Sequence, residues 1–460
     1  MPRWRDGVVT TRFTNHGLSA AASREPNPQD AAHALALALC HEHAGFVLFF
    51  CSAEYPLSQL ADALCQAFGE LPVSGCTTAG ELTPDGYDRG SIVAICFDRR
   101  LFAVETALID DLEHFDLPTA QPLVDGLLER CRRQAVAPVN EHSFALTLLD
   151  GLSSREEQVL ATLDAALGRI PSFGGSAGDD NHLTHTHVYA EGRFHTRAAV
   201  VVMINTRLPF DVFSTHHLEP LAHKLVVTAV DRERRRVLEL NGLPAAELYA
   251  SLVGCPVEAL TPAVFAQHPL AVHLGGQHYI RSIQRVNDDG SLSFYCAVEN
   301  GIVLTAMQPT PLLEDLARML QDVEERLGEP AAIIGCDCFL RRMALESLGQ
   351  LDRASALLRQ ARVIGFNTYG EQHHGMHVNQ TFTGGGLWHS SSSLMCRRRT
   401  TWRPCVKRIS ACAKCVQRSW SAWSPAVLLM GRPMRPSSAR CCWPSRCASA
   451  PTRCTARWMN

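Results

Sequence analysis

Three short segments combine a hydroxyl side chain, a glycine and a carboxylate, which together could bind a polar ligand. Each segment directly follows an apolar run that is typical of a buried strand. The hydroxyl and the carboxylate can hydrogen-bond a ligand, and the glycine permits a positive φ and a close approach of the backbone. The same residue types also occur in turns that only hold strand ends, and this bracing role is an equal alternative. The segments are Thr78-Ala79-Gly80-Glu81, Ser176-Ala177-Gly178-Asp179 and Thr368-Tyr369-Gly370-Glu371.

The elements before each segment follow one pattern of strand, helix and strand. From the start of the first strand to the acid is 35, 35 and 39 residues, a spacing that chance does not readily produce. Loops after the carboxyl ends of strands are where open α/β sheets bind ligands, so we expect the three segments to converge. Ser154 to Glu157 resembles a capping box at the second helix. The predicted elements are 46–51, 57–68 and 72–75; 144–150, 154–167 and 170–174; and 332–336, a helix from about 339, and 363–365.

The stretch between the second and third units has a different character. It predicts a hairpin of strands 224–229 and 236–240, followed by a short helix at 245–252. A strand meander at 272–306 and an amphipathic helix at 311–327 come next. A domain boundary is therefore expected near residue 220. We predict an α/β fold with mixed sheets, arranged as an N-terminal extension (1–34), a first domain (35–220) and a second domain (221–384).

The last part of the chain differs in composition from the rest. No Asp or Glu follows Glu371, whereas residues 384–460 carry 14 Lys or Arg and eight of the 18 cysteines. A nucleic-acid-binding arm and a metal or disulfide module are two interpretations. Neither explains why Arg, Ser, Cys, Trp and Pro rise together. We interpret residues 385–460 as coding sequence read one base out of frame and expect no stable core there.

Composition excludes several classes of protein. No run of about 18 apolar residues is present, so no membrane span is expected, and no apolar run precedes Ala31, which argues against a secretory signal. Most of the ten cysteines before residue 384 lie in apolar runs, as reduced thiols of a cytoplasmic protein do. The acidic body argues against nucleic-acid binding, and no P-loop is present.

Two glycine-rich motifs, Gly75 to Glu81 and Gly174 to Asp180, resemble the hallmarks of the N-terminal FIST sensory domain. Arg281-Ser282-Ile283, Gly335-Cys336-Asp337-Cys338 and the segment from Gly365 to Thr381 resemble its C-terminal partner domain. The resemblance covers about residues 35–384. It implies a bacterial signal-input protein that binds a small ligand and regulates a histidine kinase in two-component signalling.

The subgroup that the chain most resembles comprises the nitric-oxide-sensing haem proteins. Haem requires an axial ligand, usually a neutral histidine, in an apolar pocket. The resemblance therefore implies a haem cofactor, for which His217 and His268 are the axial candidates among many histidines. For any single histidine a structural role is the more common one.

A general sensor of amino acids or other small metabolites is the alternative, with Arg281 facing the ligand carboxylate and Glu371 or Asp179 its ammonium group. A cysteine-dependent hydrolase with Cys76 as nucleophile is a second alternative, although no partner at fixed spacing supports it, and we expect no enzyme. The predicted ligand-binding residues are Cys76, Thr78, Glu81, Ser176, Asp179, Arg281, Asp337, Thr368, Glu371 and Gln372.

Overall fold

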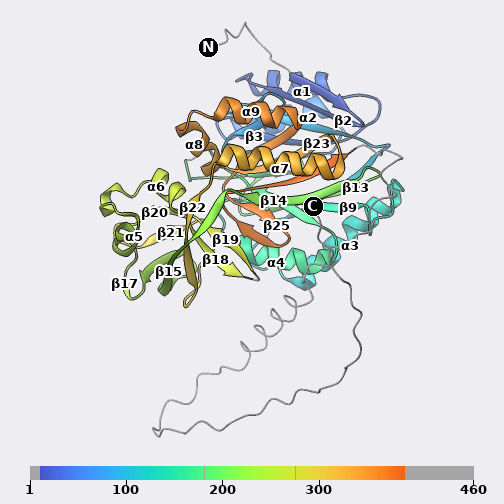
Figure 1. Ribbon diagram of the computed structural model, residues 1–460. Helices are drawn as coiled ribbons and strands as arrows, with labels where there is room; N and C mark the ends of the chain where they lie inside the picture. Colours follow the sequence, from blue (N-terminus) through green and yellow to red (C-terminus); the bar gives the residue numbers. More distant parts are fainter. Residues whose placement is uncertain (1–10, 181, 275, 389–460) are drawn as a thin grey trace, which may run out of the picture. The chain divides into compact units, whose positions relative to one another are not determined.

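Three of the four sheets repeat one strand order. Figure 1 shows the helices and strands, coloured along the chain. This computed structural model describes residues 11–180, 182–274 and 276–388. The first sheet contains, in order, β1 (Thr11–Asn15), β2 (Leu18–Ser23), β7 (Ile92–Asp98), β3 (Ala44–Ser52), β4 (Val73–Thr78), β11 (Val188–Ala190) and β12 (Arg193–His195). The second contains β8 (Phe102–Ile109), β13 (Ala199–Thr206), β9 (Ser143–Leu149), β10 (Ser172–Ser176), β25 (Glu371–His373) and β26 (Met376–Val378). The third contains β14 (Phe210–His216), β27 (Thr381–Trp388), β23 (Pro330–Cys338), β24 (Val363–Thr368), β5 (Glu81–Thr83) and β6 (Gly86–Asp88).

Each of these sheets is completed by a hairpin from another repeat. The parallel pairs are β3 with β4, β9 with β10, and β23 with β24. Strand β5, which follows β4 in the chain, pairs with β24 of the third sheet. Strand β11, which follows β10, pairs with β4 of the first sheet, and β25, which follows β24, pairs with β10 of the second sheet. The chain leaves its own sheet at the three tetrads, which we call corner 1 (78–81), corner 2 (176–179) and corner 3 (368–371). This exchange brings the three corners together.

The three sheets share one core. Their inner faces contribute alternate apolar side chains to a single cluster that includes Phe50, Leu148, Phe173, Ile334 and Phe366. Phe50 and Phe366 stack with ring centroids 4.5 Å apart, which joins the first sheet to the third. The outer faces are covered by helices, because each crossover between parallel strands must return over the sheet. The helices are α1 (Pro28–Leu39), α2 (Leu57–Phe68), α3 (Leu117–Gln134), α4 (Glu156–Leu167), α7 (Leu312–Leu327), α8 (Phe339–Ser347) and α9 (Leu351–Gln360).

The fourth sheet is built from residues that lie between β14 and α7. It has its own apolar core, with Tyr249 and Phe265 among its largest buried side chains. Its order is β19 (Gln277–Arg281), β18 (Leu270–Leu274), β22 (Val303–Pro309), β15 (Leu218–Asp231), β16 (Arg236–Leu240), β21 (Leu292–Phe294) and β20 (Ile283–Val286), with β17 (Leu243–Pro244) paired to β16. Helices α5 (Ala245–Val253) and α6 (Pro262–Gln267) and a 3₁₀ turn (Val257–Ala259) accompany it.

The predicted α/β fold with mixed sheets is confirmed, and helix 57–68 has the predicted bounds. The predicted capping box is wrong. Helix α4 begins at Glu156 without a side-chain cap, and the Glu157 carboxylate accepts hydrogen bonds from other parts of the chain. Within the predicted strand meander at 272–306, β19 ends at Arg281 and β20 begins at Ile283, and the backbone N–H of Ser282 between them donates to Asn379.

Residues 385–388 continue β27 and are buried, which differs from the expectation of no stable core from residue 385 onward. Residues 389–460 lie outside the described residues, so the out-of-frame interpretation stays a prediction. Among the described residues, no helix is long and apolar enough to cross a membrane.

Candidate functional site

The three corners are in direct backbone contact. Corner 1 meets corner 3's strand through Ala79 N–H to Asn367 O at 2.9 Å. In corner 2, the Gly178 N–H donates at 3.0 Å to the carbonyl of Thr77, the residue directly before corner 1, and the Ser176 N–H donates at 2.8 Å to the carbonyl of Gly370 in corner 3. The convergence expected from the repeated pattern is therefore present.

The corner glycines are required mainly by close packing. A Cβ added to Gly178 would lie 2.5 Å from the backbone nitrogen of Ala79, and one on Gly370 would lie 1.9 Å from Nε2 of His377. A positive φ, the other reason for glycine, occurs only at Gly80, where φ is 132°. Close approach is thus the common reason for glycine in corners 2 and 3.

Corners 1 and 3 use their carboxylates to close the turn. The Thr78 hydroxyl donates to Oε1 of Glu81, and Ser91 donates to Oε2 from its backbone N–H at 3.2 Å and its hydroxyl at 2.9 Å. Corner 3 repeats this arrangement with Thr368, Glu371 and Thr381. Burial raises the pKa of Glu81 to about 8 and that of Glu371 to about 7, against the lowering effect of these hydrogen bonds. Both carboxyl groups are fully buried and engaged within the fold.

Corner 2 uses its carboxylate to hold a loop. Oδ1 of Asp179 accepts from Leu183 N–H at 2.9 Å and from the Tyr369 hydroxyl of corner 3. Oδ2 accepts from the backbone N–H of Thr184 at 2.6 Å and of His185 at 3.0 Å. Burial would raise the pKa of Asp179, but these hydrogen bonds outweigh it and lower the pKa. Asp179 therefore fixes the 183–185 loop to the centre of the molecule.

That loop forms one wall of a cavity of about 640 Å³, a size typical of small-ligand sites. The cavity lies where β9 ends and α4 begins. Asp150, the first residue after β9, accepts from Leu152 N–H at 3.0 Å, Arg197 N–H at 2.5 Å and the Thr186 hydroxyl. Side chains of both charges line the cavity: Asp110, Asp111, Glu113 and Asp150, together with Arg155 and Arg197.

The ten predicted ligand-binding residues are all at most 7% exposed, and none lines this cavity. Ser176 donates to Glu156, Arg281 donates to the His377 carbonyl at 3.1 Å, and Asp337 pairs with Arg341 at 2.7 Å. Asp337 also accepts from the Tyr87 hydroxyl at 2.7 Å. Of the predicted residues, Asp179 is the one that shapes the cavity, through the loop that it holds.

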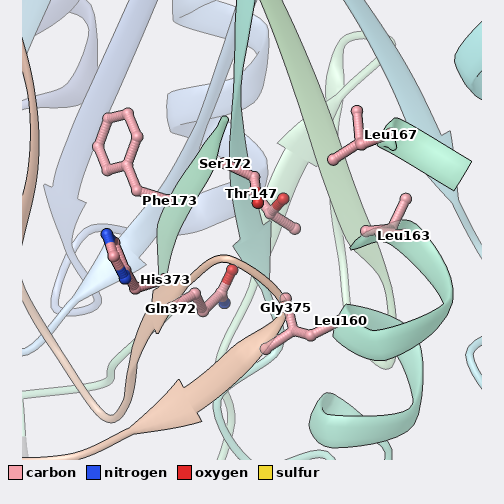
Figure 2. A pocket seen from close by; sticks show the side chains of 9 residues that line it. All are labelled: Thr147, Leu160, Leu163, Leu167, Ser172, Phe173, Gln372, His373 and Gly375. Carbon is pink, nitrogen blue, oxygen red and sulfur yellow. The ribbon is translucent and has the colours of Figure 1, made fainter. Parts of the chain in front are cut away.

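Gln372 faces a second, much smaller cavity of about 10 Å³ (Figure 2). Gln372 and His373 lie on one side of it and Leu160, Leu163 and Leu167 on the other (Figure 2). This volume is about that of a single water molecule. Both polar atoms of the Gln372 amide lack a hydrogen-bond partner among the described residues, which fits one buried water and excludes a larger ligand.

The predicted haem ligands do not lie in haem-like surroundings. His217 is buried between β14 and β15, and its Nδ1 lies 3.0 Å from the Arg341 guanidinium. Burial, Arg341 and His216 all lower its pKa, so the ring is neutral, and His217 lines neither the large cavity nor the small one beside Gln372. His268 is exposed at the end of α6. The large cavity is lined by charged side chains, whereas a haem requires an apolar pocket, so the residues that line this cavity do not fit a haem.

The predicted nucleophile is also poorly placed for chemistry. Cys76 lies inside β4 with no exposed surface. Burial, with smaller contributions from Cys51 and Cys336, raises the pKa of its thiol well above the usual value. A neutral, enclosed thiol is a poor nucleophile.

The cavity residues were not predicted from the sequence, although one signal pointed to them. Asp150 is the last residue of the predicted strand 144–150, and the carboxyl end of a strand is the position where α/β sheets place ligand contacts. The residues brought to it by distant segments, such as Asp111 and Arg197, leave no local pattern.

The FIST N domain family matches residues 45–243, and the FIST C domain family matches residues 245–374. Together the two matches cover more than half of the chain. The chain belongs to the FIST domain proteins. FIST domains are small-ligand sensory domains in signalling.

No curated protein matches this FIST protein. Among solved structures, PurLQS from Thermotoga maritima and T. maritima PurL complexed with FGAR are similar at 11% identity. Each match covers 82% of this chain and 74% of the chain in the solved structure, with TM-scores of 0.17 for the first and 0.16 for the second. A likeness of this size carries no conclusion about fold or function.

Proposed function

We propose that this FIST protein is a signal-input protein that binds a small zwitterionic ligand, of the amino-acid class, in the cavity beside Asp150. The supporting observation is the presence of both charge signs around one open cavity. Arg155 and Arg197 provide guanidinium groups for a carboxylate, for which Arg has a matching planar geometry. Asp110 and Asp111, which follow β8, provide carboxylates for an ammonium group.

The position of the cavity supports the same ligand. Ser153, Ser154 and Arg155 line it directly before α4, whose N-terminal end carries the positive pole of the helix dipole. A ligand carboxylate is favoured there, while the acidic segment after β8 favours the positive end of the ligand. A ligand with one charge of either sign would leave half of the lining without a partner.

Corner 2 supplies a physical route from the cavity to the rest of the molecule. The loop at the cavity, residues 183–185, is held by Asp179, and Asp179 also accepts a hydrogen bond from Tyr369 of corner 3. Tyr369 packs against Tyr295 and Phe339, which belong to the C-terminal half. A ligand that shifts the loop thus changes the hydrogen bonding of Asp179 and, through it, the packing of Tyr369.

The signal is passed, in this proposal, to a histidine kinase in the cytoplasm. This part rests on the resemblance to two-component FIST regulators. The role is binding and not catalysis, consistent with the enclosed, neutral thiol of Cys76. Haem carrying nitric oxide remains a prediction of the same resemblance, and a Soret band in the purified protein, shifted by nitric oxide, is its test.

The proposal is tested by thermal melting of the full chain with each of the twenty amino acids. A ligand at one hundred times its Kd stabilises the folded state by about 2.7 kcal/mol, which is readily measured. Arg197→Ala should abolish the shift, whereas Arg132→Ala, an exposed arginine on α3, should leave it intact. If no amino acid shifts the melting temperature, or if both variants respond alike, the proposed site is wrong.

A further inference from the structure

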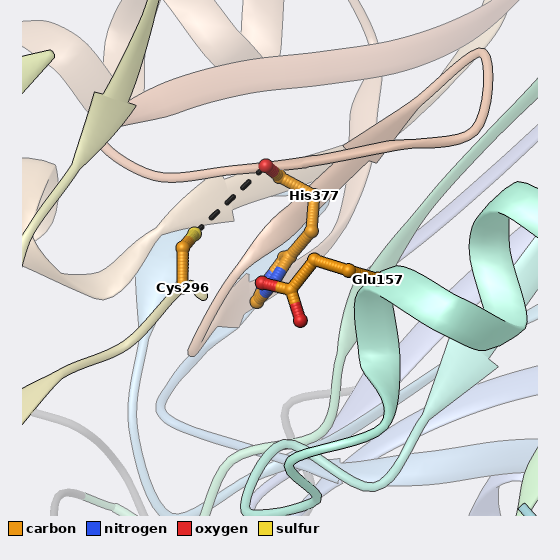
Figure 3. A group of neighbouring side chains, drawn as sticks. All are labelled: Glu157, Cys296 and His377. Atoms are coloured by element: carbon orange, nitrogen blue, oxygen red, sulfur yellow. Dashed lines mark hydrogen bonds and ion pairs between the residues drawn. The ribbon is translucent and has the colours of Figure 1, made fainter. Parts of the chain in front are cut away.

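Three metal-ligating side chains, none of which lines the cavity, meet at one place. Glu157 lies in the first turn of α4, Cys296 follows β21, and His377 lies in β26 (Figure 3). One ligand atom from each lies within 4.8 Å of the other two. Cys296 and His377 are buried, while Glu157 is a quarter exposed. Figure 3 shows the Glu157 carboxylate beside the imidazole ring, with Cys296 facing His377.

We propose that Glu157, Cys296 and His377 bind a divalent transition metal of the zinc class. Thiolate, imidazole and carboxylate form a ligand set that zinc accepts, and Co²⁺ can occupy such a site in its place. Nδ1 of His377 lies 3.1 Å from Oε1 of Glu157. Two ligand atoms at zinc bonding distances in a tetrahedral site are about 3.4 Å apart, so the metal can enter with a small adjustment.

The other nitrogen of the ring supports this assignment. Nε2 of His377 has no hydrogen-bond partner among the described residues, and Oε1 of Glu156 lies 3.5 Å from it. Histidines that bind metals through one nitrogen usually donate the other N–H to a carboxylate, which fixes the ring and its tautomer. Glu156 is in position to do this, as a positioning residue that does not touch the metal. Gly370 leaves the room that Nε2 requires, since a Cβ there would lie 1.9 Å away.

The surrounding charges are compatible with a cation. Arg235 contacts both carboxylates, at 2.8 Å from Glu156 and 2.7 Å from Glu157, and so offsets part of their negative charge. Cys296 now donates to Oδ1 of Asn379 at 3.0 Å, a bond that is lost when the thiol ionises. Three protein ligands leave a fourth position for water or another small ligand.

The metal would join parts of the chain that are distant in sequence. Glu157 belongs to the second repeat, Cys296 to the inserted fourth sheet, and His377 to the third repeat. A bound ion would therefore fix the fourth sheet against α4. This inference does not depend on the amino-acid cavity.

The test is a titration of the metal-free full chain with Co²⁺, followed by its thiolate charge-transfer absorption, and with Zn²⁺ against a chromophoric chelator. Other cysteines in the full chain can also bind metal, so the result is read as a difference between variants. Compared with the wild type, Cys296→Ser should bind one equivalent of metal fewer and should lose the corresponding part of the cobalt–thiolate absorption. The control Cys336→Ser, which alters another buried cysteine, should keep both.

Glu157→Gln provides a second measurement that does not disturb the core, because it keeps the shape of a quarter-exposed side chain. It should weaken binding at this site by at least about tenfold. Unchanged stoichiometry and affinity in a folded Cys296→Ser protein would overturn the proposal. If that variant does not fold, unchanged zinc affinity in Glu157→Gln would overturn it.

Discussion

Corners 1 and 3 differ from corner 2 in what their carboxylates hold. In corners 1 and 3 a glutamate accepts from the hydroxyl of its own tetrad and from a residue ten positions later, so the turn closes on itself. In corner 2 the acid is an aspartate, one methylene shorter, and it holds the 183–185 loop instead. The corner hydroxyl, Ser176, bonds to Glu156.

The three tetrads therefore have two different roles: corners 1 and 3 stabilise their own turns, and corner 2 positions a cavity wall. In a closed corner the carboxyl group is fully buried and both of its oxygens already accept hydrogen bonds within the fold. The open corner connects a cavity wall to the centre of the molecule. The two interpretations of the tetrads, bracing and ligand binding, therefore apply to different copies, and even corner 2 contributes through its loop and not by direct contact.

The largest effect is expected at the contact that both kinds of corner share. Gly178→Ala places a Cβ 2.5 Å from the backbone nitrogen of Ala79, where no side chain can move aside. We expect a loss of about 4 kcal/mol in the free energy of unfolding, measured by urea denaturation. Gly126→Ala is the control. It lies in the middle of α3 with only a long arginine tip nearby, and alanine should stabilise the helix by up to about 1 kcal/mol. Equal losses in both variants would show that corners 1 and 2 are not in tight contact.

Breaking the open corner alone should have the next largest effect. Asp179→Asn places an amide NH₂ where one carboxylate oxygen now accepts backbone N–H groups of the 183–185 loop. A loss of about 3 kcal/mol is expected, since hydrogen bonds to a charged group are replaced by facing donors. Hydrogen exchange should accelerate at the amides of Thr184 and His185 but not at the amide of Thr381, which donates to Glu371 of corner 3. Uniform acceleration would show that corner 2 supports the whole fold and not one loop.

Much of the fold followed from periodicity. The short β-rich runs and the helical spacing of Leu60, Leu64 and Phe68 predicted β3, α2 and β4 because local pattern determines buried strands and amphipathic helices. The exchange of hairpins between repeats was not predictable, because the strands β5, β11 and β25 are only three residues long and their partners are distant in sequence.

The site was predicted less completely than the fold. The tetrads stood out because three glycine–acid patterns recur at matched spacing, and the structure does bring them together. Corner 2 is the one connected to the cavity because the short Asp179 side chain holds the 183–185 loop, which lines the cavity. The sequence could not show that the carboxyl groups of Glu81 and Glu371 are fully buried and do not contact a ligand, because the four residues of a tetrad do not determine its burial.

The closed corners should also produce a pH dependence that the open corner lacks. Burial raises the pKa of Glu81 to about 8 in the folded state, whereas an unfolded glutamate has a pKa near 4.3. The stabilising effect of this proton is complete below the unfolded pKa and is lost as pH rises through the folded pKa. Between pH 6 and pH 9 the wild type should lose about 3 kcal/mol more than Glu81→Gln.

Urea denaturation at each pH measures this difference. Asp179→Asn is the control, because the lowered pKa of Asp179 keeps it ionised throughout this range. A slope that is the same in the wild type and in Glu81→Gln would mean that Glu81 is already ionised at pH 6.

The smallest effect is expected where the open corner uses a hydroxyl. Thr184→Val removes one donor to Asp179 at 3.1 Å but leaves the three loop N–H bonds, so the cost should be about 0.5 kcal/mol. Thr368→Val makes the same change in a closed corner, where the lost hydroxyl faces a fully buried carboxyl group and the cost should be about 2 kcal/mol. Thermal melting of the two variants gives the comparison directly. Because the substitutions are identical, equal costs would mean that the closed and open corners do not differ in how they use their acids.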